Sequence, residues 1–299
     1  MRIFSVIFTL ALFLTLSAAE FTGSHASVPA GTLQIIQIDN PNQIGDIYLF
    51  KTPEGKFILT DTGLTGTAEN VLIPALEKYG VREIDCLILT HFHSDHVGGA
   101  LTLLNDPNFK IKKIICSPLP AKDCPERTAV RYQETIAQLA KLHQIPVHHT
   151  KIGEVIEFGK GLKARIVGTA NPGKKYILNS HSIVFHLTYG TFSALFTGDC
   201  GFQQEALILA GKHQIKSDVL KVGHHAGAGS TSERFLKTVA PKIAIVTMPK
   251  WLSEDPRGIR VEKMIRKHKI PFYRSWEYPE LIVFSDGKTF GIAGAVPEK

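Results

Sequence analysis

Short apolar runs separated by tight polar turns occupy the chain from residue 33 onward. The runs are rich in Ile, Leu, Val and Phe, which is typical of strands buried in a sheet. Asn, Pro and Gly fill the turns between them, and residues 67–79 show apolar positions at helical spacing before Gly80. This part of the chain is therefore predicted to form strands at Leu33–Ile38, Ile47–Lys51, Phe57–Thr60 and Cys86–Leu89 and helices at 67–79 and 100–105.

The second half of the chain continues in the same manner. Its predicted strands are Ile111–Cys116, Val147–His149, Glu154–Phe158, Lys163–Gly168, Val219–Val222 and Ile243–Met248, with hairpins at Ser182–Tyr189 with Thr191–Thr197 and near 281–292. Its predicted helices are Ala129–His143, 202–211, Ser232–Val239 and Gly258–His268. Strands and helices do not alternate strictly, and two strand-rich halves with helices outside them predict an α/β fold of the four-layer αββα sandwich type.

The N-terminus has a different composition. Arg2 precedes an apolar stretch, Ile3–Leu16, and small residues follow up to Ala19, which predicts a secretory signal peptide over 1–19. The alternative is an uncleaved N-terminal anchor, although the stretch is short for a membrane span. We expect a flexible lead at 20–32, one domain at 33–299, no stable membrane span after cleavage, and a secreted or periplasmic protein.

The formal charge of +7 would attract polyanions or acidic membrane surfaces, but many soluble proteins with this charge bind neither. Export also makes disulfides possible. Cys116 and Cys124 flank a Pro-rich segment and either pair or remain free. Cys86 lies in a predicted strand and is expected to be an inert core thiol. Cys200 directly follows a candidate metal ligand, which disfavours a disulfide there.

Residues 90–99 read Thr-His-Phe-His-Ser-Asp-His-Val-Gly-Gly and follow the strand Cys86–Leu89. If the extended chain lasts to His93, then His91 and His93 share one face, because side chains alternate along a strand. The chain then turns and brings Asp95 and His96 to the same point. Three imidazoles and a carboxylate are ligands suited to zinc, or to manganese or iron.

Further candidate ligands lie downstream. Asp199 ends a predicted hairpin strand, where it either bridges two metals or forms a turn. His224 and His225 follow another strand; one of them can bind a second metal while the other makes a supporting contact or transfers a proton. Asp61 can orient a ligating imidazole, and His181 either completes the first metal site or lies on a loop.

In composition and order, these motifs resemble the metallo-β-lactamase superfamily, and within it the hydrolase-like domain of ComEC-type DNA-uptake proteins. The resemblance spans about 33–292 and implies metal 1 at His91 and His93. It implies metal 2 at Asp95, His96 and His224, with Asp199 bridging both metals. ComEC-type domains often have an Asn-x-x-Ser pattern where other members have a third histidine for metal 1. This chain has that pattern at 179–182 together with His181. The resemblance does not extend to the channel portion of those proteins, so it implies no role in moving DNA across a membrane.

The expected function is hydrolysis. We expect two divalent cations, with zinc favoured and manganese or iron as alternatives. They lower the pKa of a bridging water from near 16 to about 7 and so supply hydroxide. Asp95 orients it, and His225 gives a proton or hydrogen bond to the leaving group. A phosphodiester is the favoured substrate, which makes the enzyme nuclease-like. The alternatives are acyl hydrolysis of a lactam, lactone or thioester, and a non-catalytic metal-binding protein.

Basic side chains are the candidate contacts to substrate phosphates, although they also fit a solvated basic face. They are Lys221, Lys250, Arg257, Arg260, Arg266 and Lys267.

Overall fold

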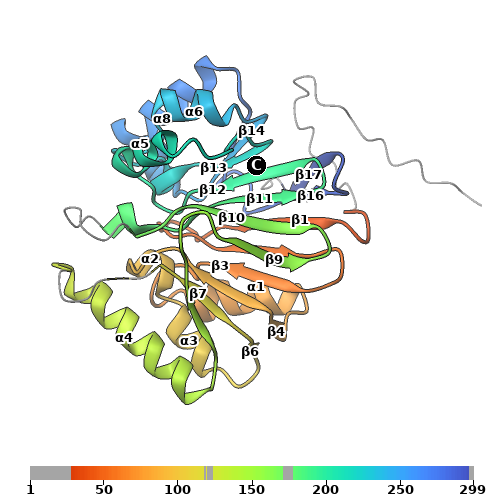
Figure 1. Ribbon diagram of the computed structural model, residues 1–299, viewed down its shortest axis with the longest axis vertical. Helices are drawn as coiled ribbons and strands as arrows, with labels where there is room; N and C mark the ends of the chain where they lie inside the picture. The colour runs from red at the N-terminus through yellow and green to blue at the C-terminus, as the bar shows by residue number, and fades with distance from the viewer. Residues whose placement is uncertain (1–27, 118, 120–123, 171–177, 296–299) are drawn as a thin grey trace, which may run out of the picture.

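Two large sheets lie face to face at the centre of the molecule, and helices cover the outer face of each (Figure 1). The computed structural model describes residues 28–117, 119, 124–170 and 178–295. The eight-stranded sheet has the order β17-β16-β1-β2-β3-β5-β7-β8, and the seven-stranded sheet has the order β15-β14-β13-β12-β11-β10-β9. A small third sheet pairs β4 with β6. This arrangement confirms the predicted α/β sandwich.

The strands of the eight-stranded sheet are β1 (Leu33–Ile38), β2 (Tyr48–Lys51), β3 (Phe57–Thr60), β5 (Cys86–Leu89), β7 (Ile114–Cys116), β8 (Val147–His149), β16 (Glu280–Ser285) and β17 (Phe290–Ala295). The other sheet contains β9 (Val155–Gly159), β10 (Leu162–Gly168), β11 (Val184–Tyr189), β12 (Phe192–Phe196), β13 (Val219–Lys221), β14 (Ile243–Val246) and β15 (Phe272–Arg274). The pair outside both is β4 (Glu83–Ile84) and β6 (Lys110–Ile111).

The α-helices are α1 (Ile73–Lys78), α2 (Ser94–Val97), α3 (Ala100–Asn105), α4 (Arg127–Leu142), α5 (Phe202–Ala210), α6 (Glu233–Val239), α7 (Lys250–Ser253) and α8 (Pro256–Lys267). A π-helical turn, Ala68–Leu72, leads into α1, and 3-10 turns occupy Leu178–His181 and Gly223–Ala226.

Three apolar clusters fill the spaces between the four layers. One lies between the eight-stranded sheet and α1, α3 and α4, and includes Leu59, Leu76 and Leu103. The second lies between the two sheets and includes Phe50, Phe185 and other rings. The third packs β12–β14 against α5, α6 and α8. Alternate residues of the central strands belong to different clusters, which explains why these strands read as continuous apolar runs.

Strand direction decides where the loops meet. In one sheet β3, β5, β7 and β8 are parallel, and in the other β12, β13, β14 and β15 are parallel. Because the carboxyl ends of parallel strands lie at one edge, the loops after β3, β5, β12 and β13 are brought together there. These are the loops that carry the candidate ligands.

Some elements differ from the sequence prediction. The single strand expected at Ile111–Cys116 is two strands, β6 and β7, because the two lysines at 112–113 interrupt the apolar run and β6 pairs with β4 instead. The structure also contains α2, α7 and β15, which the sequence did not predict. Each is only three or four residues long, too short for apolar positions to show a helical or strand repeat.

The four cysteines are all buried and free, so the disulfide considered between Cys116 and Cys124 is not formed. Burial raises the pKa of the Cys86 and Cys116 thiols to about 12, which keeps both protonated at neutral pH. Cys86 is therefore an inert core thiol, as predicted. The predicted signal peptide at 1–19 lies outside the described residues. Within the part of the chain that is described, no helix has the length and apolar character needed to cross a bilayer.

Candidate metal centre

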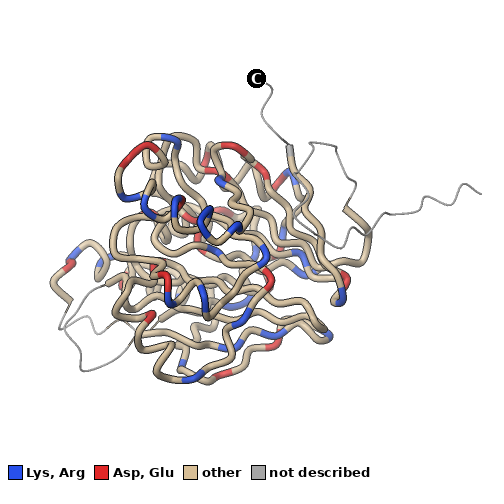
Figure 2. Tube along the Cα trace, turned by 90° about the horizontal axis from the view of Figure 1, so that it is seen from above, with Lys and Arg blue, Asp and Glu red and all other residues tan. Residues whose placement is uncertain are grey.

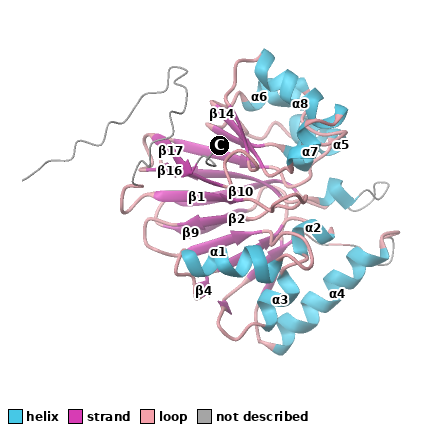
Figure 3. Ribbon diagram, turned by 180° about the vertical axis from the view of Figure 1, so that it is seen from behind, coloured by secondary structure: helices cyan, strands magenta, loops and turns pink. Residues whose placement is uncertain are grey.

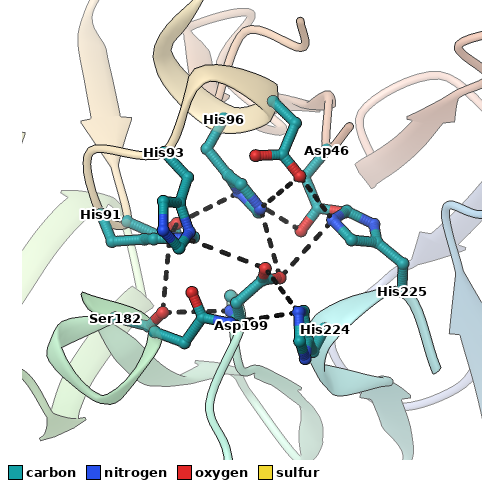
Figure 4. Close-up of polar contacts among 12 residues, drawn as sticks. Asp46, His91, His93, His96, Ser182, Asp199, His224 and His225 are labelled. Atoms are coloured by element: carbon teal, nitrogen blue, oxygen red, sulfur yellow. Dashed lines mark hydrogen bonds and ion pairs between the residues drawn. The ribbon is translucent and has the colours of Figure 1, made fainter. Parts of the chain in front are cut away.

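The loops after β3, β5, β12 and β13, from both halves of the sandwich, converge at the carboxyl edge of the parallel strands. Figure 3 shows the loops on this edge lying between α2 on one side and α5 and α7 on the other. In the close-up the imidazoles of His91, His93, His96 and His225 surround the carboxylate of Asp199 (Figure 4). The side chains therefore come from distant parts of the sequence but share one small volume.

The first group of converging ligand atoms belongs to Asp95, His96, Asp199 and His225, all within 4.8 Å of one another. His225 Nε2 is 3.3 Å from Asp95 Oδ2, and His96 Nε2 is 3.2 Å from Asp199 Oδ1. Three of these atoms, His96 Nε2, His225 Nε2 and Asp199 Oδ1, are buried without a hydrogen-bond partner. Buried polar atoms are normally paired. Orphaned nitrogen and oxygen atoms that face one point fit a divalent cation.

In both His96 and His225, the ring nitrogen Nδ1 is held by a protein acceptor, which leaves Nε2 facing the site. His96 Nδ1 lies 2.8 Å from Asp61 Oδ2, and His225 Nδ1 lies 2.9 Å from the carbonyl oxygen of Thr247. A carbonyl only accepts, so Nδ1 of His225 donates this hydrogen bond and Nε2 is left facing the site. Such a contact on the far nitrogen is how proteins fix the orientation and tautomer of a metal-binding histidine.

The second group of converging ligand atoms belongs to His91, His93 and Asp199. His91 Nε2 is 3.0 Å from His93 Nδ1 and 3.8 Å from Asp199 Oδ2. The far nitrogen of His93, Nε2, contacts Glu126 Oε2 at 2.8 Å. Asp199 thus turns Oδ1 toward the first group and Oδ2 toward the second, which is the placement a bridging carboxylate requires.

Asp61 lies beneath the centre and is fully buried. It accepts hydrogen bonds from the backbone N–H of Thr90 at 2.8 Å and from the Thr90 hydroxyl at 2.7 Å, besides its contact with His96. These two contacts hold its carboxylate against His96. Asp61 therefore occupies the place of an orienting acceptor that the sequence suggested.

His224 and His181 are not members of these groups, although His224 lies beside Asp199. Among the described residues, neither contributes to any group of three or more converging ligand atoms. His224 Nε2 faces the side-chain amide of Asn179 at 3.1 Å, and its ring is 3.9 Å from Asp199. With a side chain 36% exposed, His224 lies on the rim, whereas His225 is buried. The two neighbours thus hold positions opposite to those implied by the resemblance.

The backbone explains how adjacent histidines diverge. His224 and His225 both adopt left-handed conformations, with φ of 50° for each. Such conformations are rarely adopted by residues other than glycine and persist where the surrounding structure imposes them, often at functional sites. No spacing rule applied to the sequence reveals this turn.

Gly98 and Gly99 allow the loop of 91–96 to pack closely. A Cβ on Gly98 would lie 2.1 Å from the backbone nitrogen of Thr65, and one on Gly99 would lie 2.3 Å from the carbonyl oxygen of Thr62. The Thr62 N–H in turn bonds the carbonyl of His96 at 2.7 Å. Any side chain here would push the metal-binding loop away from the β3 loop.

The electrostatics of the cluster are dominated by its carboxylates. Burial by itself would lower the pKa of His96, but Asp199, Asp61 and Asp95 outweigh it and raise that pKa well above its usual value. Burial likewise opposes, but does not prevent, a fall in the pKa of Asp199 caused by His96 and His225. The pKa of His91 is lowered, by burial first and then by His96. The chain thus concentrates negative charge where cations are expected.

Two functional candidates were not found from the sequence, Asp46 and Glu126. Asp46 follows Gly45, two residues before β2, and is buried against His225, with 3.4 Å between its Oδ1 and Nδ1 of the imidazole. Neither residue has a spacing relation to the histidine motif. The only sequence signal for Asp46 is a charged residue directly before an apolar strand.

Comparisons with known proteins agree with this geometry. The family model described as "Metallo-beta-lactamase superfamily" matches residues 41–248, and the chain belongs to that superfamily. Its sequence is close to the ComEC-type proteins. The chain is 32% identical over 209 residues to ComE operon protein 3 of Bacillus subtilis (strain 168), which covers 69% of this chain and 25% of that protein.

A second relative is recombination protein 2 of Haemophilus influenzae, 31% identical over 202 residues, covering 66% of this chain and 22% of the relative. The chain therefore spans about a quarter of the length of these curated relatives. A solved structure, a diphosphatase of the PhnP family, covers 81% of this chain and 94% of its own at 14% identity and a TM-score of 0.47.

Proposed function

We propose that the chain is a dinuclear metal hydrolase acting on phosphodiesters. His91, His93 and Asp199 would hold one cation, and Asp95, His96, His225 and Asp199 the other. The observation that carries this proposal is the convergence of three orphaned buried atoms from three loops, with Asp199 directed to both groups. Nitrogen and oxygen donors favour zinc, with manganese or iron as alternatives. Both halves of the chain supply ligands, so we treat 33–299 as one functional unit.

When bound, two cations would supply Lewis acidity that activates a water and stabilises developing negative charge. The chain's own residues would do the rest. Asp95, whose pKa is lowered by His96 and His225 despite burial, remains ionised and directs its Oδ2 into the site. His224 is the candidate proton donor to the leaving group, because it lies on the rim beside Asp199 and is not needed as a ligand. This exchanges the roles first expected for His224 and His225.

Similarity to ComEC-type relatives, one of which is named a recombination protein, supports a phosphodiester substrate. Only some of the predicted basic side chains are placed to contact a substrate phosphate. Lys221 is 1% exposed and cannot reach a substrate, which corrects that expectation. Arg257, Arg266 and Lys267 pair with acidic neighbours on or beside α8. Figure 2 shows basic and acidic positions interspersed along the trace.

Two basic residues of the predicted set remain candidates for contacts to substrate. Arg260 stacks over the ring of Phe202, the first residue of α5, at 5.4 Å, and it donates to the carbonyl of Ser230. Lys250 lies 5.6 Å from the ring of Trp276. Phe202 comes three residues after Asp199 in the sequence. A cation beside an exposed aromatic ring suits a nucleotide, which offers both phosphate and a base.

The test combines metal content with a substrate panel. The purified protein, loaded with zinc or manganese, is incubated with bis-p-nitrophenyl phosphate, single-stranded DNA and a chromogenic cephalosporin. We expect phosphodiester cleavage that is lost in Asp199→Ala and kept in His143→Ala, an exposed histidine outside the site. Turnover of the cephalosporin alone would reject the phosphodiester proposal. No turnover with full metal occupancy would favour a binding protein.

We also propose that the protein is exported through residues 1–19. N-terminal sequencing of the protein from the native cell envelope or medium should then begin at Glu20. An intact Met1 in exported protein would favour an uncleaved anchor.

A further inference from the structure

Lys221 is the sole lysine or arginine that is fully buried among the described residues. It is the last residue of β13, and its ammonium forms an ion pair with Asp46, whose side chain is also buried. The same ammonium donates to the carbonyl oxygen of Gly198 at 2.9 Å. A buried charge is costly unless it is paired and hydrogen-bonded, and this one is both.

The partners of Lys221 lead directly to two of the proposed ligands. Gly198 precedes Asp199, so the ammonium holds the backbone from which the carboxylate of Asp199 projects. Asp46 accepts from the hydroxyl of Thr247, and the carbonyl of Thr247 accepts from His225 Nδ1 at 2.9 Å. One lysine is thus connected to the carboxylate that would bridge the metals and to the histidine that would complete the second site.

The pair also joins the two halves of the sandwich. Asp46 stands before β2 in the eight-stranded sheet, whereas Gly198, Lys221 and Thr247 follow or end β12, β13 and β14 in the other sheet. The backbone N–H of Asp46 bonds the carbonyl of Asp95 at 3.2 Å, so a third proposed ligand is tied to the same point.

We propose that Asp46 and Lys221 form a positioning pair that sets the geometry of the second metal site. It fixes Asp199 through Gly198 and fixes His225 through Thr247. Asp46 also belongs to a third group of converging ligand atoms, with Asp61 and His96 Nδ1. Because the Lys221 ammonium already engages the Asp46 carboxylate, Asp46 acts as an acceptor for protein donors and not as a metal ligand.

The proposal rests on the ligand assignment given under the proposed function. The central variant is Lys221→Met, which keeps the length of the side chain and removes its charge. Metal dissociation constants are measured by competition with a chromogenic chelator, and the Co²⁺ absorption spectrum reports ligand geometry. Supporting contacts of this kind typically alter metal affinity about 10–100-fold. We expect the second equivalent to bind Lys221→Met about 10–100-fold more weakly, and the first equivalent, whose site shares only Asp199 with the second, to be weakened less.

Lys242→Met provides the matched control. Lys242 pairs with Asp218 at 2.8 Å on the same sheet but is exposed, so its loss should leave both dissociation constants as in the parent. The double variant Asp46→Asn/Lys221→Met separates folding from positioning. Removing both partners of a buried pair is better tolerated than removing one. Without metal, the melting temperature of the double variant should be closer to that of the parent than the melting temperature of Asp46→Asn or Lys221→Met is. The second metal should still bind the double variant weakly.

Parent-like affinity for both equivalents in Lys221→Met would overturn the proposal, even if the variant melted earlier, because the pair would then support only the fold. If Lys221→Met does not fold, Thr247→Val tests the connection from Asp46 to His225: it removes the hydroxyl that contacts Asp46 and keeps the carbonyl that contacts His225. Unchanged second-metal affinity in that variant would refute positioning through Thr247. Failure of His225→Ala to lose metal would instead contradict the ligand assignment itself.

Discussion

The Nε2 atom of His225 lies 3.3 Å from Oδ2 of Asp95, although the two residues come from opposite halves of the sandwich. Asp95 follows β5 in one sheet and His225 follows β13 in the other. This contact closes the candidate metal centre across the interface between the sheets. It also distinguishes His225 from its neighbour His224, whose Nε2 faces Asn179.

The first prediction concerns these neighbours. His225→Ala should lose about one equivalent of metal, because it removes a buried nitrogen from a group of four ligands. His224→Ala should keep both equivalents and lose turnover if His224 donates a proton. Elemental analysis after dialysis against metal-free buffer measures the first effect, and steady-state kinetics the second. The reverse pattern of metal loss would restore the assignment implied by the family resemblance.

The second prediction concerns the close contact below the motif. Gly99→Ala should destabilise the protein by about 1–3 kcal/mol, the usual cost of overpacking, because its Cβ would lie 2.3 Å from a backbone oxygen. It should also weaken metal binding by displacing the loop of 91–96. Gly55→Ala is the control: its φ of +83° is unfavourable, but nothing lies within 4 Å. We expect it to cost about 1 kcal/mol with metal retained. Urea unfolding with and without chelator measures both.

The third prediction is a release of protons when metal binds. The pKa of His96 is raised well above its usual value, so after chelation this residue holds a proton at neutral pH that a metal must displace. Metal affinity should therefore rise with pH up to the raised pKa of His96, because the metal must displace this proton throughout that range. In the metal-free protein, the raised pKa of His96 stabilises the fold. This stabilisation is fully present below about pH 6.5, where a histidine titrates in the unfolded chain, and is lost as pH rises through the raised pKa.

Calorimetric titrations in buffers of different ionisation enthalpy count the protons released. Asp61→Asn removes one of the carboxylates that raise the pKa of His96, so it should release fewer protons than the parent. It should also bind metal more weakly, because an amide orients the imidazole less firmly than a carboxylate. Equal proton release in the two proteins would show that Asp61 does not hold the proton on His96.

The fold was largely predictable because the buried strands are short apolar runs bounded by Asn, Pro and Gly. Strands β1 and β3 begin and end where the sequence predicts, since their residues contact cores on both faces. The run ending in Cys116 was misread because periodicity does not show that Lys110–Ile111 pairs with a different partner, β4. Pairing between short strands depends on neighbours that are distant in sequence.

The candidate site was predictable in part, for a related reason. The motif His91 to His96 has a dense local spacing, and Asp199 ends a recognisable strand. The role of Asp46 and the burial of Lys221 could not be predicted from the sequence, because each depends on the ion pair that the two residues form with one another. A lysine at the end of a strand normally indicates an exposed position. Which of two adjacent histidines turns inward depends on a left-handed turn that composition does not specify.

The last prediction concerns Glu126, at the start of α4. Its carboxylate lies 2.8 Å from His93 Nε2, so it accepts the proton on that nitrogen and leaves Nδ1 directed toward His91 and the first group. Glu126→Ala should weaken binding of the first metal about 10-fold, the lower end of the effect expected when a contact on a ligating histidine is lost. The second metal should be unaffected, since Glu126 contacts none of its ligands.

Glu126→Gln separates orientation from charge. The amide oxygen of glutamine can still accept from His93 Nε2, so this variant should keep most of the affinity if orientation is what matters. Glu134→Gln, a charge change on the same helix without a metal-site contact, is the control. Competition titrations that resolve the two equivalents measure the effect. If Glu126→Gln and Glu126→Ala weaken the first metal equally, the negative charge is what matters, and Glu126 acts through the field at His93 rather than by holding its tautomer.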